Sequence, residues 1–296
     1  MVIPVLNAAR YLPELIPAIL GQKPVAPAEI VLVDSMSTDN TREIAQSFQN
    51  VRVVPIEDFS HGRARNLGVR EAKGGIVVLM TQDALPQDDT WLAKLIAPLA
   101  DDKVAATYSR QVPYEDANPM ERYFLLTHFP PGPAVRRKKV HDGELNFGQV
   151  FFSNVAAALR RDLLLQFPFD ETLIMSEDQQ VSRDLLNAGY SVVYAPDSVV
   201  IHSHKYSLGM VFRRYFDSVY SLTLIFKEHD MGTSASMGFR YLFREMGYML
   251  RKHPLWLPYY ACYTVMKTTG TLAGHFAGRI PRSWAKKMSM HSYHWE

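Results

Sequence analysis

Carboxylates occur at two places in the chain where their setting would suit catalysis. Asp83 follows the apolar run 77–80 in "VVLMTQDALPQD" and leads at once into a turn that contains a proline. Glu177 and Asp178 are adjacent in "IMSEDQQVSRDLLNAGY". A pair of carboxylates suits a general base, because each negative charge raises the pKa of the other. Acids in the first turn of a helix are also favoured by the helix dipole, so a purely structural role stays open.

Two histidines, His202 and His204, follow an apolar run in "VVIHSHKYS". In an extended chain they lie on the same side, which suits metal coordination or contact with phosphate. A hard divalent cation needs few protein ligands, because water and substrate phosphates complete its octahedron. Asp83 could therefore hold such a cation with the help of one other side chain. The alternative is that Asp83 only caps a turn.

Polar residues also follow the second predicted strand, in "VLVDSMSTDNT". Asp34 ends that strand, where a carboxylate can accept hydrogen bonds from ribose hydroxyls or a pyrimidine N–H. Asn40 and Glu43 have the spacing of a capping box, which predicts the start of a helix. Asp39 beside them fits either a helix cap or a ligand contact.

The stretch "FSHGRARNLG" predicts a helix that begins at Ser60 or His61. Its first turn carries Arg63, Arg65 and Asn66, and a helix N-terminus with guanidinium groups is a natural place for phosphates. Basic side chains are unfavourable at that end of a helix, so the pattern favours an anionic partner. Arginines that simply face solvent are the alternative.

Strand-like and helix-like patterns alternate along the first hundred residues and must position these side chains. The strand-like segments are rich in Val, Ile and Leu, which is typical of parallel strands buried on both faces. They span residues 1–6, 29–34, 51–56, 76–82 and 103–109, and the helical segments span 8–22, 40–48, 62–72 and 89–100. We therefore expect an α/β fold with a mostly parallel central sheet between helices, and with ligands beyond the carboxyl ends of the strands.

The second half of the chain departs from this alternation. Residues 130–146 are expected to form a mobile or binding-ordered loop, because three prolines, two glycines and a basic run interrupt the pattern before sheet-like residues 148–161. From Lys205 to the end there are 13 Lys/Arg and 5 Asp/Glu, a net charge of +8 in long helical segments rich in aromatics. Such helices suit a membrane interface, although a helical subdomain with solvated basic residues is the alternative. The predicted domains are 1–205 and 206–296.

Composition limits the class of protein. The chain has 296 residues, a net charge of +2 and 47% hydrophobic residues, enough for one large domain or a domain with an appendage. A single cysteine excludes an intramolecular disulfide framework and a cysteine-only zinc site. With no signal peptide before "VIPVL" and no uncharged run of about 20 residues, we expect a cytoplasmic protein.

The five stretches quoted above, taken in order, resemble the family 2 glycosyltransferases of the GT-A fold over roughly residues 1–205. "FSHGRARNLG" and "TQDALP" are especially similar to the bacterial rhamnosyltransferase branch. The resemblance implies an enzyme that moves a sugar from a nucleoside diphosphate to an acceptor hydroxyl with inversion at the anomeric carbon.

The resemblance also implies a role for each matching residue. Asp178 would be the general base, and Glu177 would orient it or the acceptor. Asp83 would occupy the metal position of the family's Asp-x-Asp motif. Here Gln82 precedes Asp83, Ala84 follows it, and no second aspartate closes the triplet. His202, or else His204, would complete the coordination of Mg²⁺ or Mn²⁺. The residues expected around the nucleotide sugar are Pro4, Asn7, Asp34, Asp39, Arg63, Arg65, Asn66, Gln82 and Asp83.

For the substrates, the branch implies dTDP-L-rhamnose as the donor and a polyprenyl diphosphate-linked saccharide as the acceptor, in the synthesis of a cell-envelope polysaccharide such as O-antigen. The enzyme would then lie peripherally on the inner face of the membrane. No nucleic-acid partner is expected, and a homo-oligomer stays open.

Other functions fit the sequence less well. A sugar-1-phosphate nucleotidyltransferase would have a glycine-rich loop where this chain has "PVLNAAR", and a nicotinamide oxidoreductase would have G-x-G-x-x-G there. A glycosyltransferase with another donor, or a non-catalytic sugar-nucleotide-binding or membrane scaffold protein, is the remaining alternative.

Overall fold

The computed structural model describes residues 1–226 and 231–296, which form two compact units. Unit 1 comprises Met1–Val112, Phe129–Thr172 and Glu177–His202. Unit 2 comprises Pro113–His128, Leu173–Ser176 and Ser203–Glu296. The longest segment of unit 2, Ser203–Glu296, begins near the predicted domain boundary at 205/206. Unit 2 also takes in residues 113–128 and 173–176. Whether 1–205 and 206–296 are separate folding domains stays a prediction.

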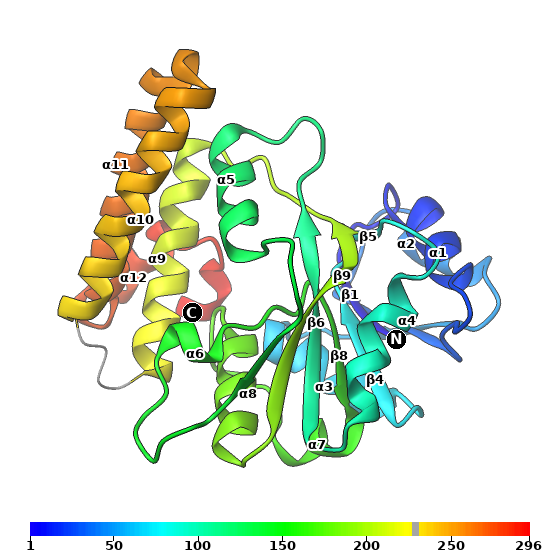
Figure 1. The fold of residues 1–296 in the computed structure, drawn as a ribbon. Coiled ribbons are helices and arrows are strands. Elements are labelled where there is room, and N and C mark those ends of the chain that lie inside the picture. Colours follow the sequence, from blue (N-terminus) through cyan, green and yellow to red (C-terminus); the bar gives the residue numbers. More distant parts are fainter. Residues whose placement is uncertain (227–230) are drawn as a thin grey trace. The chain divides into compact units, whose positions relative to one another are not determined.

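A mixed sheet forms the centre of unit 1 (Figure 1). Its strands in the described part of the chain are β1 (Val2–Val5), β2 (Ile30–Asp34), β3 (Val51–Pro55), β4 (Ile76–Met80), β5 (Leu85–Pro86), β6 (Val104–Val112), β7 (Val135–Lys138), β8 (Ala156–Arg160) and β9 (Ser191–Ile201). The spatial order is β3-β2-β1-β4-β8-β6-β9-β5, and β7 pairs with β9. Strands β1 to β4 are parallel, as are β6 and β9, whereas β8 runs antiparallel to both β4 and β6. The expected mostly parallel sheet is confirmed.

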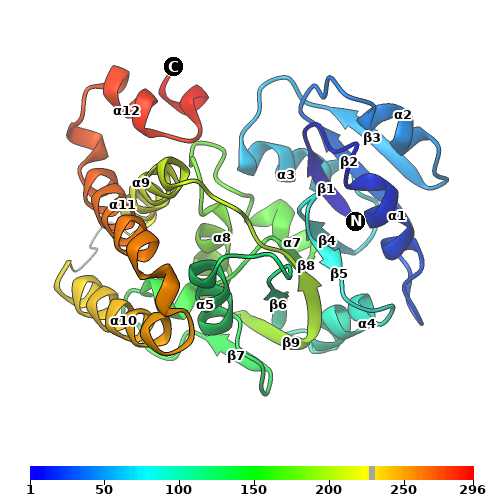
Figure 2. The same ribbon diagram turned by 90° about the horizontal axis from the view of Figure 1, so that it is seen from above.

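Helices cover both faces of this sheet, so the strand side chains are buried on both sides (Figure 2). On one face, α1 (Leu12–Leu20), α2 (Thr41–Gln46) and α4 (Trp91–Ile96) share a core with every second residue of the strands, such as Ile3 and Val5. On the other lie α3 (His61–Glu71), α7 (Arg161–Gln166) and α8 (Glu177–Asn187). Helix α3 lies so close to the sheet that a Cβ on Gly68 would lie 2.2 Å from Val2 Cγ1. Glycine at this position therefore permits the approach of helix to strand.

Three local predictions require correction. Residues 130–146 are not all loop, because β7 pairs antiparallel with β9. Its side chains are mostly exposed, so backbone pairing rather than a hydrophobic pattern forms it. The sheet-like segment 148–161 contains only β8, since its first residues belong to the short helix α6 (Phe147–Val150). Asn40 makes no side-chain cap, and the Asp39 carboxylate accepts the Thr41 N–H instead.

Unit 2 is helical, and its described residues form two apolar clusters. Its helices in the described residues are α5 (Pro119–His128), α9 (Leu208–Ile225), α10 (Met231–Lys252), α11 (Leu257–His275) and α12 (Arg282–Met288). Helices α9 and α11 pack closely, because Gly270 and Gly274 lie against the backbone of Phe212 and Phe216. Within the described residues, none of these helices has both the length and the apolarity to span a bilayer.

Candidate active site

Four strand ends of unit 1 meet at one edge of the sheet and supply its polar side chains. Strands β4, β6 and β9 point the same way, so Asp83, Gln111 and His202 lie at their carboxyl ends. The antiparallel strand β8 starts at that edge and brings Asn154 there. In α/β sheets this is the edge where ligands bind.

The Asp83 and His202 side chains face each other, with 3.6 Å between Asp83 Oδ1 and His202 Nε2. The other ring nitrogen, His202 Nδ1, lies 2.9 Å from Gln111 Oε1. Gln111 Nε2 donates to Ser153 Oγ at 2.9 Å, so Gln111 Oε1 is oriented to accept from the imidazole. An imidazole protonated at Nδ1 presents the lone pair of Nε2 toward Asp83. A hydrogen bond to the far nitrogen is the usual support of a metal-ligating histidine, so this donor set fits a divalent cation.

His204 belongs to unit 2, and its backbone N–H donates to Glu121 Oε1 at 3.5 Å. A role for His204 beside Asp83 therefore stays a prediction from the sequence. Gln111 was missed there, because the predicted strand ended at Ser109, three residues before the end of β6 at Val112. A buried amide at the end of a strand was the signal that could have found it.

The loops after β1 and β2 are held together by side chains predicted to bind the nucleotide sugar. The Gln82 amide accepts the Leu6 N–H at 2.8 Å and donates to the Leu6 carbonyl at 3.1 Å. Asn7 has a left-handed backbone with φ of 50°, and its side chain accepts the Thr38 N–H at 2.9 Å. Both side chains shape the binding edge, and any contact with a donor stays a prediction.

Asp34 is fully buried at the end of β2. Its carboxylate accepts from Arg42 Nε at 2.6 Å and from the Ser37 N–H at 3.1 Å. Asp39 accepts from the Thr41 hydroxyl and from the backbone N–H groups of Ala9 and Thr41, both at 3.1 Å. The bond from the hydroxyl, and then the backbone bonds, lower the pKa of Asp39. Pro4 lies within β1, opposite Val33. The structure thus gives both aspartates internal partners, and their contact with a nucleoside is untested.

Helix α3 starts as predicted, because the Ser60 hydroxyl accepts the Arg63 N–H at 3.1 Å. The anionic partners of its basic residues are carboxylates of the protein itself. Arg63 pairs with Asp58, and its Nε lies 3.2 Å from Glu171 Oε2. Asn66 clamps the same segment through two hydrogen bonds with the Phe169 backbone, at 2.8 and 3.0 Å.

Arg65 forms the most enclosed of these pairs. Its guanidinium lies 3.0 Å from Glu177 Oε1, and each side chain is only 7% exposed. Burial acts to raise the pKa of Glu177, but Arg65 and His61 overcome it and hold the pKa below its usual value. Arg65 thus favours the ionised form of Glu177 and fixes the position of its carboxylate.

Asp178 differs from Glu177, because its pKa is raised rather than lowered. It is partly exposed, and it accepts the backbone N–H groups of Asn154 at 3.3 Å and Gln179 at 2.9 Å. Burial, and then the charge of Glu177, raise the pKa of Asp178 to about 7. The preceding Ser176 has φ of 65°, an unusual conformation for a residue other than glycine, and such residues cluster at functional sites. A reachable carboxylate with a pKa near neutrality is what a general base requires.

Comparison with known protein families assigns the chain to one of them. The model for glycosyl transferase family 2 matches residues 1–166. The chain belongs to this family. Over all of its length it is 31% identical to the O-antigen chain rhamnosyltransferase RfbN of Salmonella typhimurium, of which it covers 95%. It is 32% identical to the O-antigen chain rhamnosyltransferase WbaN of Salmonella anatum, over 91% of this chain and 86% of that one. The protein is thus a glycosyltransferase.

Solved structures share the fold. The mannosyltransferase PcManGT from Pyrobaculum calidifontis, in complex with GDP-Man and Mn²⁺, aligns with a TM-score of 0.61 at 20% identity over 92% of this chain and 84% of that one. S. aureus TarS 1-349 in complex with UDP-GlcNAc aligns with a TM-score of 0.57 at 16% identity over 98% of this chain and 83% of that one. The predicted GT-A fold is confirmed.

Proposed function

We propose that the protein transfers L-rhamnose from dTDP-L-rhamnose to a hydroxyl of a lipid-linked saccharide, with inversion at the anomeric carbon. The observation that carries the proposal is the pair of adjacent acids, of which Glu177 is held charged by Arg65 while the pKa of Asp178 is raised to about 7. The two Salmonella relatives, named as O-antigen rhamnosyltransferases, support the sugar.

Asp178 acts as the general base. It takes the proton of the acceptor hydroxyl while that oxygen forms a bond to the anomeric carbon from the face opposite the leaving group. The bond between the anomeric carbon and the diphosphate oxygen breaks, and dTDP leaves with the electron pair. Glu177 stays ionised, so its charge keeps Asp178 basic enough to accept a proton near neutral pH.

Asp83 and His202 would hold a divalent cation, Mg²⁺ or Mn²⁺, with His204 as the alternative histidine. Such a cation would supply positive charge to stabilise the departing diphosphate. Gln111 keeps the His202 ring in the orientation and tautomer that coordination requires. The nucleotide sugar binds beside the loops that follow β1 and β2 and beside the start of α3, which carries Arg63, Arg65 and Asn66. Hydrogen bonds and ion pairs within the protein hold these segments in place.

The acceptor is a saccharide on a polyprenyl diphosphate, and the enzyme lies peripherally on the inner face of the membrane. Helix α10 supports this location, because four large apolar side chains at i, i+4, i+7 and i+11 lie on one of its faces and are 38–75% exposed. These are Phe239, Phe243, Met246 and Leu250. Exposed basic residues flank this apolar stripe, namely Arg240, Arg244, Arg251 and Lys252. An apolar stripe with a basic border suits an anionic lipid surface.

The test is transfer by the purified protein from dTDP-L-rhamnose to a panel of lipid diphosphate-linked monosaccharides, followed by mass spectrometry. We expect one acceptor to gain a deoxyhexose. In the Asp178→Asn variant kcat should fall by about 10²- to 10⁴-fold while dTDP affinity is kept. Asp162→Asn, which neutralises an exposed carboxylate of α7, is the matched control. Unchanged turnover in Asp178→Asn would exclude Asp178 as the base, and absence of transfer to every acceptor would exclude the proposed reaction.

A further inference from the structure

Two half-buried arginines of unit 1, Arg110 and Arg137, lie near the same tyrosine and form what we call the arginine pair. Arg110 belongs to β6, two residues before its carboxyl end, and Arg137 belongs to β7. Burial raises the pKa of Tyr194 on β9, and the positive charges of both arginines oppose that shift. The ion pairs of the described residues include neither Arg110 nor Arg137. The reaction described above does not use them.

Most hydrogen-bond donors of the arginine pair are unused. Arg137 donates from Nη1 to the Tyr108 hydroxyl at 2.6 Å. Arg110 Nε is buried and has no partner within the described part of the chain. Each guanidinium has five N–H donors, and a buried donor of a charged group costs free energy when it has no acceptor. Two half-buried cations with unused donors therefore favour an anion that supplies both acceptors and counter-charge.

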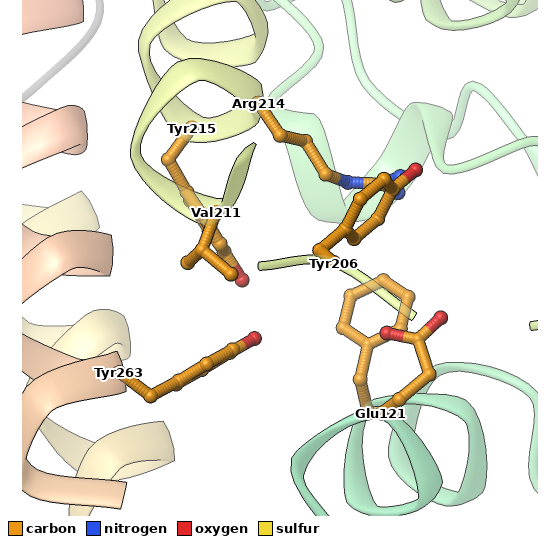
Figure 3. A pocket seen from close by; sticks show the side chains of 7 residues that line it. Glu121, Tyr206, Val211, Arg214, Tyr215 and Tyr263 are labelled. Atoms are coloured by element: carbon orange, nitrogen blue, oxygen red, sulfur yellow. The ribbon is translucent and has the colours of Figure 1, made fainter. Parts of the chain in front are cut away.

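Other arginines of the chain have a carboxylate beside them. Arg136 precedes Arg137 on β7, so its side chain lies on the other face of the strand, and it pairs with Asp101 at 2.6 Å. In unit 2, Arg214 and Glu121 line the same small hollow (Figure 3), and the charge of Arg214 opposes the rise in the Glu121 pKa that burial causes. The arginine pair has no such counter-charge, so its missing anion comes from a ligand.

The arginine pair is connected to the segment that carries the proposed base. The Tyr108 ring, whose hydroxyl accepts from Arg137, lies 5.4 Å from the Phe152 ring, centre to centre. The Phe152 carbonyl accepts from Gln179 Nε2 at 2.5 Å, and Gln179 directly follows Asp178. All of these residues belong to unit 1. Two side chains thus separate Arg137 from the start of α8.

The proposed acceptor has an anion close to its reacting hydroxyl. In a polyprenyl diphosphate-linked monosaccharide, the diphosphate is bonded to the anomeric carbon of the ring that bears this hydroxyl. We infer that the arginine pair binds the diphosphate of the acceptor while Asp178 takes the proton of the hydroxyl. Guanidinium groups suit this role, because their parallel N–H groups match phosphate oxygens. The inference rests on the proposed transfer to a lipid diphosphate-linked saccharide.

Two acceptors that differ only in the diphosphate test this site. One is an alkyl diphosphate-linked form of the monosaccharide that the wild type uses, and the other is the uncharged alkyl glycoside of the same sugar. We expect Arg110→Met and Arg137→Met to raise the KM of the diphosphate acceptor about tenfold to a hundredfold. The KM of the alkyl glycoside and that of dTDP-L-rhamnose should not change. Arg137→Lys should recover part of the loss.

Arg136→Met is the matched control, because it removes the same charge from the neighbouring position of β7 and should keep the wild-type KM. Melting temperatures identify the variants that fold, and Arg110→Met keeps the test decisive if Arg137→Met does not. An unchanged KM in folded variants would overturn the inference. So would an equal rise for both acceptors, which indicates a structural effect, or an equal rise in the donor KM, which assigns the pair to the donor.

Calorimetric titration with inorganic pyrophosphate in EDTA tests the site without turnover. EDTA removes divalent cations, so the metal-binding residues take no part. Binding that weakens at least tenfold in Arg110→Met and Arg137→Met, but not in Arg136→Met, supports the site even if the wild type transfers no sugar. No binding to the wild type, or equal binding by every variant, refutes it. If these variants instead lose sedimentation with phosphatidylglycerol vesicles and keep pyrophosphate binding, the pair binds lipid headgroups and the inference is wrong.

Discussion

The raised pKa of Asp178 predicts that its replacement by asparagine stabilises the protein at alkaline pH. The pKa of Asp178 is about 7 in the folded protein, against about 3.9 for an aspartate in an unfolded chain. The folded state therefore resists ionisation, and stability falls as the pH rises from about 4 to about 7. Three pKa units at about 1.4 kcal/mol each give a penalty of about 4 kcal/mol above pH 7. At pH 5 the penalty is smaller, about 1 to 2 kcal/mol.

Asparagine cannot ionise, so Asp178→Asn removes this penalty. It also has one oxygen where the carboxylate uses two, one for the Asn154 N–H and one for the Gln179 N–H. The loss of one such hydrogen bond costs about 1 kcal/mol. The net expectation is a gain of about 3 kcal/mol in the free energy of unfolding at pH 8 and a change near zero at pH 5.

Urea unfolding at both pH values measures these differences. Asp162→Asn, on the exposed side of α7, should show no gain at pH 8 beyond a few tenths of a kcal/mol. A difference between Asp178→Asn and wild type that is the same at pH 5 and pH 8 would refute the reasoning. It would mean that the carboxylate ionises as freely in the folded protein as in the unfolded chain.

Three further predictions follow from the same structure. Glu177→Gln removes the negative charge beside Asp178 and leaves the buried Arg65 cation unpaired, so the acid limb of the pH–rate profile should move about one pH unit lower. An unmoved limb would contradict the effect of the Glu177 charge on the pKa of Asp178. Gln111→Met should weaken Mn²⁺ binding about ten- to a hundredfold in calorimetric titration, because the ring loses its orienting partner; equal affinity would contradict that role. Replacing Phe239 and Phe243 by serine should reduce sedimentation with anionic vesicles at least tenfold, whereas Leu165→Ser, at an exposed site of unit 1, should bind as wild type. Loss of self-association instead of vesicle binding would assign the stripe to an interface between copies.

The parallel part of the sheet was predictable because its strands bear a strong signal. The strands at 2–5, 30–34 and 76–80 are largely buried runs rich in Val, Ile and Leu, the strand at 51–55 is half-buried, and each of the four is followed by a helical pattern. A right-handed crossover then places their carboxyl ends at one edge. That is why Asp34 and Asp83 could be assigned to a ligand-binding edge before their contacts were known.

Contacts between distant segments were not predictable in this way. Strand β8 inserts antiparallel between β4 and β6, although nothing in its alanine-rich sequence indicates direction. Strand β7 depends on backbone pairing with β9, and its exposed side chains have no alternation. The positions of β7 and β8 depend on which strand edges remain unpaired in the folded sheet. Those edges exist only once the other strands have assembled.

The arginines of α3 show why the local pattern was incomplete. Two basic residues near the start of a helix favour negative charge nearby, and in the sequence they predicted a phosphate, which stays a prediction. For Arg65 the negative charge within the protein is Glu177, 112 positions further along the chain and 3.0 Å away. The pair explains why adjacent acids differ. The Arg65 guanidinium favours the ionised form of Glu177. Burial, together with the negative charge of Glu177, raises the pKa of Asp178. Arg65 therefore acts on the proposed base through Glu177, so Arg65→Met should alter the pH dependence of the reaction even where dTDP affinity stays the same.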